Sequence, residues 1–245
     1  MARIIAQARD RPGVLPWAVT TMNIDIYVGV IQFIVLLLSL SVHESAHAWT
    51  ADRLGDPTAR YLGRVSLNPL VHADPIGTIL FPIIGMFSGL MFGWAKPVPV
   101  NVSRLRNPAR DHMLVAAAGP VSNMLLASIL FACLMIMKST STEGAELIYR
   151  VAAYQFTGNS VLIPLTAVAY QGVIINVVLA VFNLIPVAPL DGAAVLSGLL
   201  PRPLASMLDE MQSYGFLLLI ALLYLGVPSM LYSPVINFVV SYLIV

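Results

Sequence analysis

The residues SVHESAHAWTADRLGD (41–56) decide how this chain is interpreted, because they directly continue the apolar run YVGVIQFIVLLLSLS (27–41). Residues 24–50 together are long and apolar enough for a membrane-spanning helix, which needs roughly 20 mostly apolar residues. His43, Glu44 and His47 therefore fall near the end of a predicted membrane helix. Ionisable groups are costly in a bilayer, so this position favours a functional site.

His43 and His47 have the spacing that places two imidazoles on one face of a helix, one turn apart. Neutral imidazole nitrogens are common zinc ligands, and a catalytic zinc site takes three protein ligands and keeps one position open. Glu44 flanks the pair, where it can take a proton from a water molecule activated by the metal. The alternative is a histidine pair that only hydrogen-bonds to neighbouring helices.

The third ligand is expected in the stretch FNLIPVAPLDGAAVL (182–196), where Asp191 is the only carboxylate. Pro186 and Pro189 interrupt a helix in this stretch. A broken helix at membrane depth is tolerated only where it is buried or lines a wet cavity. The alternative role for Asp191 is to cap a helix over 191–200, since Asp is a good N-cap. The two roles are compatible.

The composition indicates an integral membrane protein. Of the 245 residues, 58% are hydrophobic and only 10% are charged, whereas a soluble domain carries about 25% charged residues. The net charge of +1 gives no electrostatic footprint for nucleic acid, so no nucleic-acid partner is expected. Cys133 is the single cysteine, which excludes an internal disulfide.

Hydropathy predicts an all-α polytopic membrane protein with about five to six membrane segments. An N-terminal interfacial segment (1–23) precedes a catalytic membrane core (24–200), and further membrane segments follow (201–245). The core is expected to contain helices over 24–50, 113–137, 161–187 and 191–200, and an apolar stretch broken by glycine and proline over 76–94. A fifth apolar stretch covers 214–231, and the tail 234–245 is short for a crossing.

A shared metal restricts the topology. His43, His47 and Asp191 can bind one ion only if segments 24–50 and 161–187 end on the same side of the membrane. The broken stretch 76–94 is then re-entrant and does not cross. The arginine-rich loops on both sides of it share one face, which the positive-inside rule makes cytoplasmic. We expect the active site near the cytoplasmic face of the plasma (inner) membrane, although the N-terminal arginines disagree with this orientation.

The flanks of the re-entrant stretch, LGRVSLN (62–68) and AKPVPVN (95–101), have a strand-like composition. They predict a short membrane-associated β-hairpin near the active site. Pro97 and Pro99 cannot donate ladder hydrogen bonds, so 95–101 would be an edge strand. An edge strand can pair with an added peptide, which suits a protease whose substrate must unwind.

Three motifs in this order resemble the site-2 protease family of intramembrane zinc metalloproteases: HESAH (43–47), AAAGPVSNMLL (116–126) and FNLIPVAPLDG (182–192). The stretches GRVSLNPLVHADPIGT (63–78) and GWAKPVPVN (93–101) are similar to compact members of that family, which have no PDZ-like insertion or other appended domain. The resemblance covers roughly residues 26–200.

The resemblance implies that His43, His47 and Asp191 bind one zinc ion per chain and that Glu44 is the general base. Asn183 matches an asparagine that supports the substrate carbonyl or oxyanion.

Asn123 would help to shape the site. His72, on a predicted loop near the site, is a candidate to contact substrate or metal-activated water, with an ordinary hydrogen bond as the alternative.

The predicted function is that of a zinc metalloendopeptidase that cleaves membrane proteins in or near their transmembrane segments, as in regulated intramembrane proteolysis. Its partners would be these substrates and the lipid bilayer. Two alternatives use the same ligands: a metal transporter or sensor, and a non-catalytic protein that binds membrane segments. Glu44 discriminates, because neither alternative needs a base beside the histidines.

Overall fold

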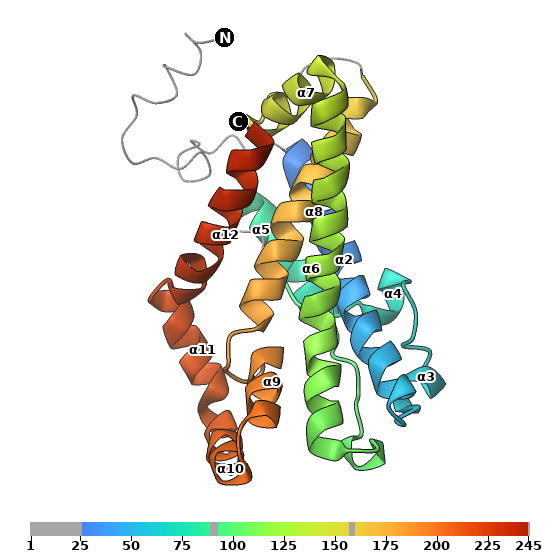
Figure 1. Ribbon diagram of the computed structural model, residues 1–245, viewed down its shortest axis with the longest axis vertical. Coiled ribbons are helices and arrows are strands. Elements are labelled where there is room, and N and C mark those ends of the chain that lie inside the picture. Colours follow the sequence, from blue (N-terminus) through green and yellow to red (C-terminus); the bar gives the residue numbers. More distant parts are fainter. Residues whose placement is uncertain (1–25, 89–92, 157–159, 245) are drawn as a thin grey trace.

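The structure is a computed structural model that describes residues 26–88, 93–156 and 160–244 (Figure 1). Within these ranges the chain is helical and contains no strand. The helices are α2 (Ile26–Arg53), α3 (Thr58–Tyr61), α4 (Pro69–His72), a π-helix (Pro75–Leu80), α5 (Phe81–Ser88), α6 (Pro108–Thr140), α7 (Thr142–Ala152), α8 (Leu162–Asn183), α9 (Asp191–Leu199), α10 (Arg202–Met211), α11 (Gly215–Tyr224) and α12 (Val227–Ile244), with single 3₁₀ turns at Val102–Arg104 and Gln212–Tyr214. The predicted interfacial segment 1–23 lies outside the described residues.

Four of the described helices are long and apolar enough to cross a membrane: α2, α6, α8 and α12. The helices Pro75–Met86 and α11 are apolar but shorter. The predicted all-helical class is therefore confirmed for an integral membrane protein, whereas the expected five to six membrane segments are not.

The predicted β-hairpin is not confirmed, because neither 62–68 nor 95–101 forms a strand. The second stretch makes other hydrogen bonds. Its Lys96 amide donates to the carbonyl of His72 at 2.8 Å, and its Val98 amide donates to the Glu44 carboxylate at 3.0 Å. These amides are consequently not available for a ladder between strands.

The boundaries of the last predicted segments were wrong. The apolar stretch 214–231 is divided by Gly226, whose φ of +71° lies in the left-handed region that favours glycine. The described part of the predicted tail, 234–244, belongs to α12, which starts just after that break. In Figure 1, α11 and α12 follow one another from α10 to the opposite end of the molecule.

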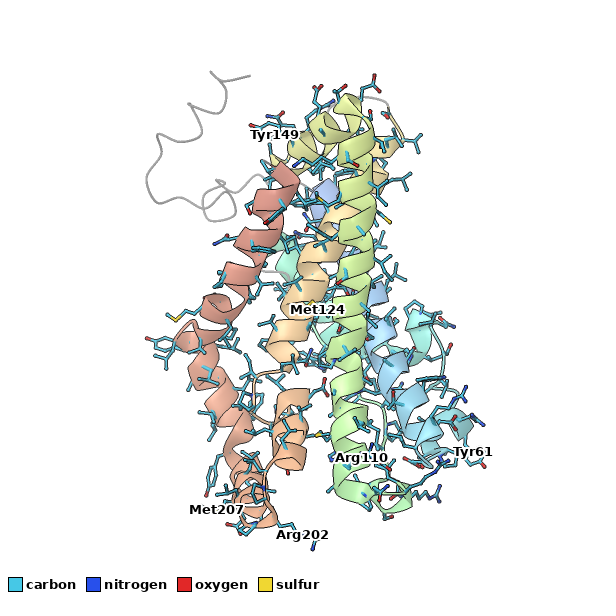
Figure 2. The ribbon with its side chains drawn as sticks, viewed as in Figure 1. Tyr61, Arg110, Met124, Tyr149, Arg202 and Met207 are labelled. Atoms are coloured by element: carbon cyan, nitrogen blue, oxygen red, sulfur yellow. The ribbon has the colours of Figure 1, made fainter. Side chains whose placement is uncertain are left out.

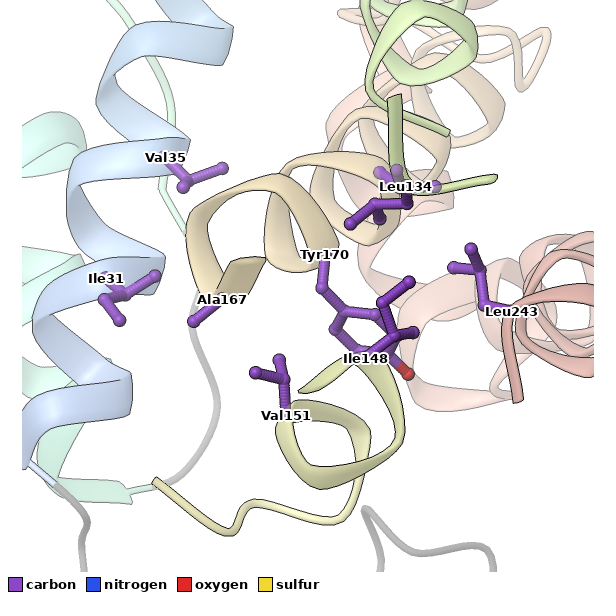
Figure 3. Packing of buried hydrophobic residues seen from close by; sticks show 9 residues of the cluster. Ile31, Val35, Leu134, Ile148, Val151, Ala167, Tyr170 and Leu243 are labelled. Carbon is purple, nitrogen blue, oxygen red and sulfur yellow. The ribbon is translucent and has the colours of Figure 1, made fainter. Parts of the chain in front are cut away.

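The long helices alternate in direction along the molecule. Tyr61, Arg110 and Arg202 lie at one end and Tyr149 lies at the other (Figure 2). At the Tyr149 end, side chains from α2, α6, α7, α8 and α12 form the largest buried apolar cluster, which includes Ile148, Val151 and Leu243 (Figure 3). The C-terminal half of α2 and the first half of α6 pack together nearer the Arg110 end.

Candidate active site

Two buried histidines from α2 face one carboxylate from α9. The Nε2 atoms of His43 and His47 are 3.0 Å apart. The Oδ2 atom of Asp191 lies 3.1 Å from the first and 3.4 Å from the second. The spacing in the HESAH motif puts both imidazoles on one face of α2, and the start of α9 brings the carboxylate to that face.

The other ring nitrogen of each histidine faces a hydrogen-bond acceptor. His43 Nδ1 lies 2.6 Å from the side-chain oxygen of Asn123, and His47 Nδ1 lies 2.7 Å from the carbonyl oxygen of Val115. Both Nδ1 atoms must therefore carry the proton and donate it. In the neutral rings the Nε2 lone pairs then point to the shared centre, which is the tautomer that a metal ligand needs.

A buried amide network fixes the orientation of Asn123. Its Nδ2 donates to the side-chain oxygen of Asn176 at 2.7 Å and to the carbonyl of Ser39 at 3.2 Å. The Nδ2 of Asn176 donates to the Ser39 hydroxyl at 2.9 Å and to the Gly172 carbonyl at 2.8 Å. With Nδ2 occupied as a donor, the oxygen of Asn123 must be the atom that faces His43.

Asp191 starts α9 without capping it. Leu190 is the N-cap residue, and no side-chain hydrogen bond caps the helix. The Oδ2 atom of Asp191 is buried and accepts no hydrogen bond among the described contacts. A Cβ on Gly192 would collide with the backbone carbonyls of Leu184 and Ile185, so glycine permits the tight turn that directs Asp191 to the histidines.

The three ligand atoms fit a zinc ion. Ligands about 2.0–2.1 Å from zinc at tetrahedral angles lie roughly 3.3–3.4 Å apart, close to the 3.0, 3.1 and 3.4 Å found here. The buried Oδ2 of Asp191 without a donor also requires a positive partner. Three protein ligands leave the fourth position open, as in catalytic zinc sites.

Gly119 on α6 leaves space for the imidazole rings of His43 and His47. A Cβ at this position would collide with His47 Nε2 and lie 2.6 Å from His43 Cε1. Sequence reasoning missed Gly119 and Asn176. The available signal for Asn176 was the amide within the apolar run VIINVVLAVF (173–182), since a polar group in a membrane segment is a candidate functional residue.

Glu44 lies beside the histidine pair and is largely buried, with 9% of its surface exposed. Its Oε2 atom accepts the Val98 amide hydrogen bond at 3.0 Å. Among the described residues, the carboxylate is held by this backbone amide and pairs with no lysine or arginine side chain. A carboxylate with one hydrogen bond keeps lone pairs for a proton, as a general base requires.

The remaining predicted residues are not among the group His43, His47 and Asp191 that lies within metal-binding distance. Asn183 donates from Nδ2 to the Leu179 carbonyl of its own helix at 2.9 Å.

His72 is 1% exposed, and its Nε2 lies 2.7 Å from the Ser66 carbonyl oxygen. Pro97 and Pro99 are exposed on either side of Val98. No contact assigns Asn183, His72, Pro97 or Pro99 a role in substrate binding or catalysis, so those roles stay predictions.

A cavity of about 340 Å³ lies beside α2 and is lined by other residues than the metal-ligand candidates. Its lining includes Ala46 and Trp49 from α2 and Leu67 from the following loop. None of His43, His47 and Asp191 lines this cavity.

Comparison with known proteins identifies the class. The family model described as peptidase family M50 matches residues 31–225. "Putative zinc metalloprotease YwhC" from Bacillus subtilis (strain 168) is 38% identical over 204 residues, which cover 83% of this chain and 84% of that protein. Rip2 of Mycolicibacterium smegmatis, whose name carries the same description, is 28% identical over 86% of this chain and 74% of its own length. No solved structure matches the chain.

The helices, the ligand geometry and these relatives define an intramembrane zinc metallopeptidase. The chain belongs to peptidase family M50, the site-2 protease family.

Proposed function

We propose that this protein is an endopeptidase that cleaves other membrane proteins in or near their transmembrane segments, with His43, His47 and Asp191 as the zinc ligands. The observation that carries the proposal is the convergence of the three ligand atoms within 3.4 Å of one another, two of them on the membrane-type helix α2. Regulated intramembrane proteolysis is the process that this activity would serve.

The proposed reaction assigns one role to each of two side chains, Glu44 and Asn183. When bound, zinc supplies Lewis acidity that polarises the scissile carbonyl and makes water more acidic. Glu44 accepts a proton from the attacking water and later gives it to the leaving amine. Asn183 donates to the developing oxyanion. In the structure one N–H of its Nδ2 donates to the Leu179 carbonyl, which leaves the second N–H of that amide for this role.

The proposed location of the site is inside the bilayer, near the cytoplasmic face of the plasma membrane. Ten residues separate His43 from Arg53 at the end of α2, which corresponds to about 15 Å along the helix axis. The helices Pro75–Leu80 and Phe81–Ser88 are short for a crossing, which supports a re-entrant passage between two loops on one side.

Residues 95–101, which form neither a helix nor a strand, are the proposed place for an unwound substrate. Pro97 and Pro99 are exposed there, and the intervening Val98 amide contacts Glu44. A helix hides its carbonyls in its own hydrogen bonds, so a substrate must become extended before its carbonyl can reach the metal.

The test is cleavage by purified, zinc-loaded protein in liposomes. The substrates are a panel of single-span membrane proteins and a synthetic reporter of roughly 20 apolar residues with a central Gly-Pro pair and a fluorophore and quencher at its ends. The wild type should cut at least one of them, whereas Glu44→Gln should retain zinc and lose cleavage. Equal cleavage by both proteins would refute the assignment of the base.

A further inference from the structure

A single peptide group connects a buried cation to Glu44. The carbonyl of Pro97 accepts a hydrogen bond from Arg64 Nη2 at 3.0 Å. The amide of Val98, on the other side of the same peptide bond, donates to Glu44 Oε2 at 3.0 Å. The Pro97–Val98 peptide group thus lies between a guanidinium and a carboxylate.

Arg64 is buried, with 6% of its surface exposed, and it binds backbone rather than acid. Its Nη1 donates to the Val71 carbonyl, and its Nη2 donates to the carbonyls of Lys96 and Pro97. No carboxylate among the described residues lies within salt-bridge distance of it. A buried charge is costly without partners, so these carbonyl dipoles must supply the compensation.

We propose that Arg64 is a positioning residue for the general base, acting on Glu44 through the Pro97–Val98 peptide group. The proposal rests on the proposed role of Glu44. A cation on the carbonyl polarises the peptide group and strengthens its N–H as a donor. The buried guanidinium therefore holds the Glu44 carboxylate in one orientation without touching it.

The local sequence suits this arrangement. Proline has no N–H and a fixed φ, so Pro97 and Pro99 stiffen the backbone and leave Val98 as the single amide donor within residues 97–99. Arginine also suits its position, because the rigid fork of the guanidinium reaches several carbonyls at once, whereas a lysine ammonium is a flexible point charge.

A purely structural role would be different. If Arg64 only linked Val71 to residues 96–97 by hydrogen bonds, its loss would lower the free energy of unfolding or the zinc content. It would not specifically raise the exchange rate of the Val98 amide. Hydrogen exchange separates the two roles, because prolines carry no amide hydrogen. Deuterium uptake within residues 97–99 therefore reports Val98 alone.

The first measurement compares deuterium uptake in wild type, Arg64→Gln and the matched control Arg60→Gln. Arg60 lies in α3, four residues before Arg64, but it pairs with Asp52, and its side chain is 62% exposed. A charge-assisted hydrogen bond contributes enough to slow exchange by about 10- to 100-fold. Arg64→Gln should release most of that protection at Val98, and Arg60→Gln should release none.

The second measurement is turnover of the synthetic reporter by Arg64→Gln, Val98→Pro and the double variant. Val98→Pro removes the amide donor, and Arg60→Gln is the control that removes an exposed cation outside residues 95–101. A misplacement of about 1 Å lowers rate by roughly 10²-fold. Each single variant should lose that much kcat with KM and zinc content near wild type, and the double variant should lose no more. Arg60→Gln should keep turnover near that of the wild type.

The outcomes are distinguishable from failure of the proposed function. Cleavage by Glu44→Gln would refute the function, while the exchange result would still stand. With Glu44→Gln inactive, wild-type kcat in Val98→Pro, or losses that multiply to roughly 10⁴-fold in the double variant, would overturn the positioning role. If Arg64→Gln fails to fold, Val98→Pro with retained zinc decides the question.

Discussion

At the scale of single residues, Gly119 limits what the site can tolerate. Gly119→Ala would place a methyl group against His47 Nε2 and 2.6 Å from His43 Cε1. The imidazoles would have to move, so we expect loss of both zinc and cleavage. Elemental analysis of the purified protein measures the metal. The control is Gly29→Ala on α2, where the added Cβ would meet only the flexible Met86 side chain at 3.2 Å; zinc retained by Gly119→Ala would contradict the expectation.

Asn176 acts on the metal through two other side chains. Asn176→Ala removes the acceptor that orients Asn123, which in turn holds the ring of His43. Loss of such a supporting hydrogen bond typically weakens metal binding by roughly 10- to 100-fold. Competition with a chelator measures the zinc affinity. Gln171→Ala, a buried polar change on the same helix whose partner is Gln32, should leave that affinity unchanged.

At the scale of elements, Asp56 joins the turn after α2 to the segment before α6. The buried carboxylate accepts hydrogen bonds from the amides of Thr58 at 3.1 Å and Asn101 at 2.6 Å. Burial acts to raise the pKa of Asp56, but the hydrogen bonds from Thr58 and Asn101 and the charge of Arg104 outweigh it and hold the pKa below its ordinary value. The ionised form therefore stabilises this junction.

This lowered pKa predicts an acid-sensitive contribution to stability. Because the folded pKa lies below the unfolded one, the stabilisation is fully present above the ordinary carboxyl pKa and is lost as pH falls through the lowered value. Asp56→Asn should cost about 1.5–3 kcal/mol at neutral pH and little at strongly acidic pH. Unfolding in detergent at both pH values measures the difference, with exposed Glu143→Gln as control. A difference that stays constant with pH would contradict the assignment.

The sequence predicts elements well where one signal dominates. The apolar runs gave α2, α6 and α8, and the histidine spacing with Asp191 gave a group that the structure brings together. It failed where a tertiary contact decides the outcome. Residues 95–101 are strand-like in composition, yet their amides bind Glu44 and the His72 carbonyl. Hydropathy also did not detect the break at Gly226, because a backbone angle carries no apolar signal.

At the scale of the whole molecule, the loops before α6 and after α2 lie at one end. Arg104 Nη1 is 3.4 Å from the Thr58 hydroxyl, and α7 lies at the opposite end (Figure 1). In a Cys133→Ser background, single cysteines at Arg60 and Arg104 should label from the same face, which the positive-inside rule makes cytoplasmic. A cysteine at Glu143 should label only from the other face. Labelling of Arg60 and Arg104 from opposite faces would make residues 75–88 part of a true crossing.

The meeting of His47 and Asp191 makes the metal a cross-link. The two ligands are 144 positions apart (191 − 47). A cross-link that closes so long a loop lowers the conformational entropy of the unfolded chain. A ligand that binds only the folded form also stabilises it by mass action. Stripping the zinc should therefore loosen the C-terminal third first, so that a protease added to the apoprotein nicks the connection between α8 and α9 before any bond within α2 or α6.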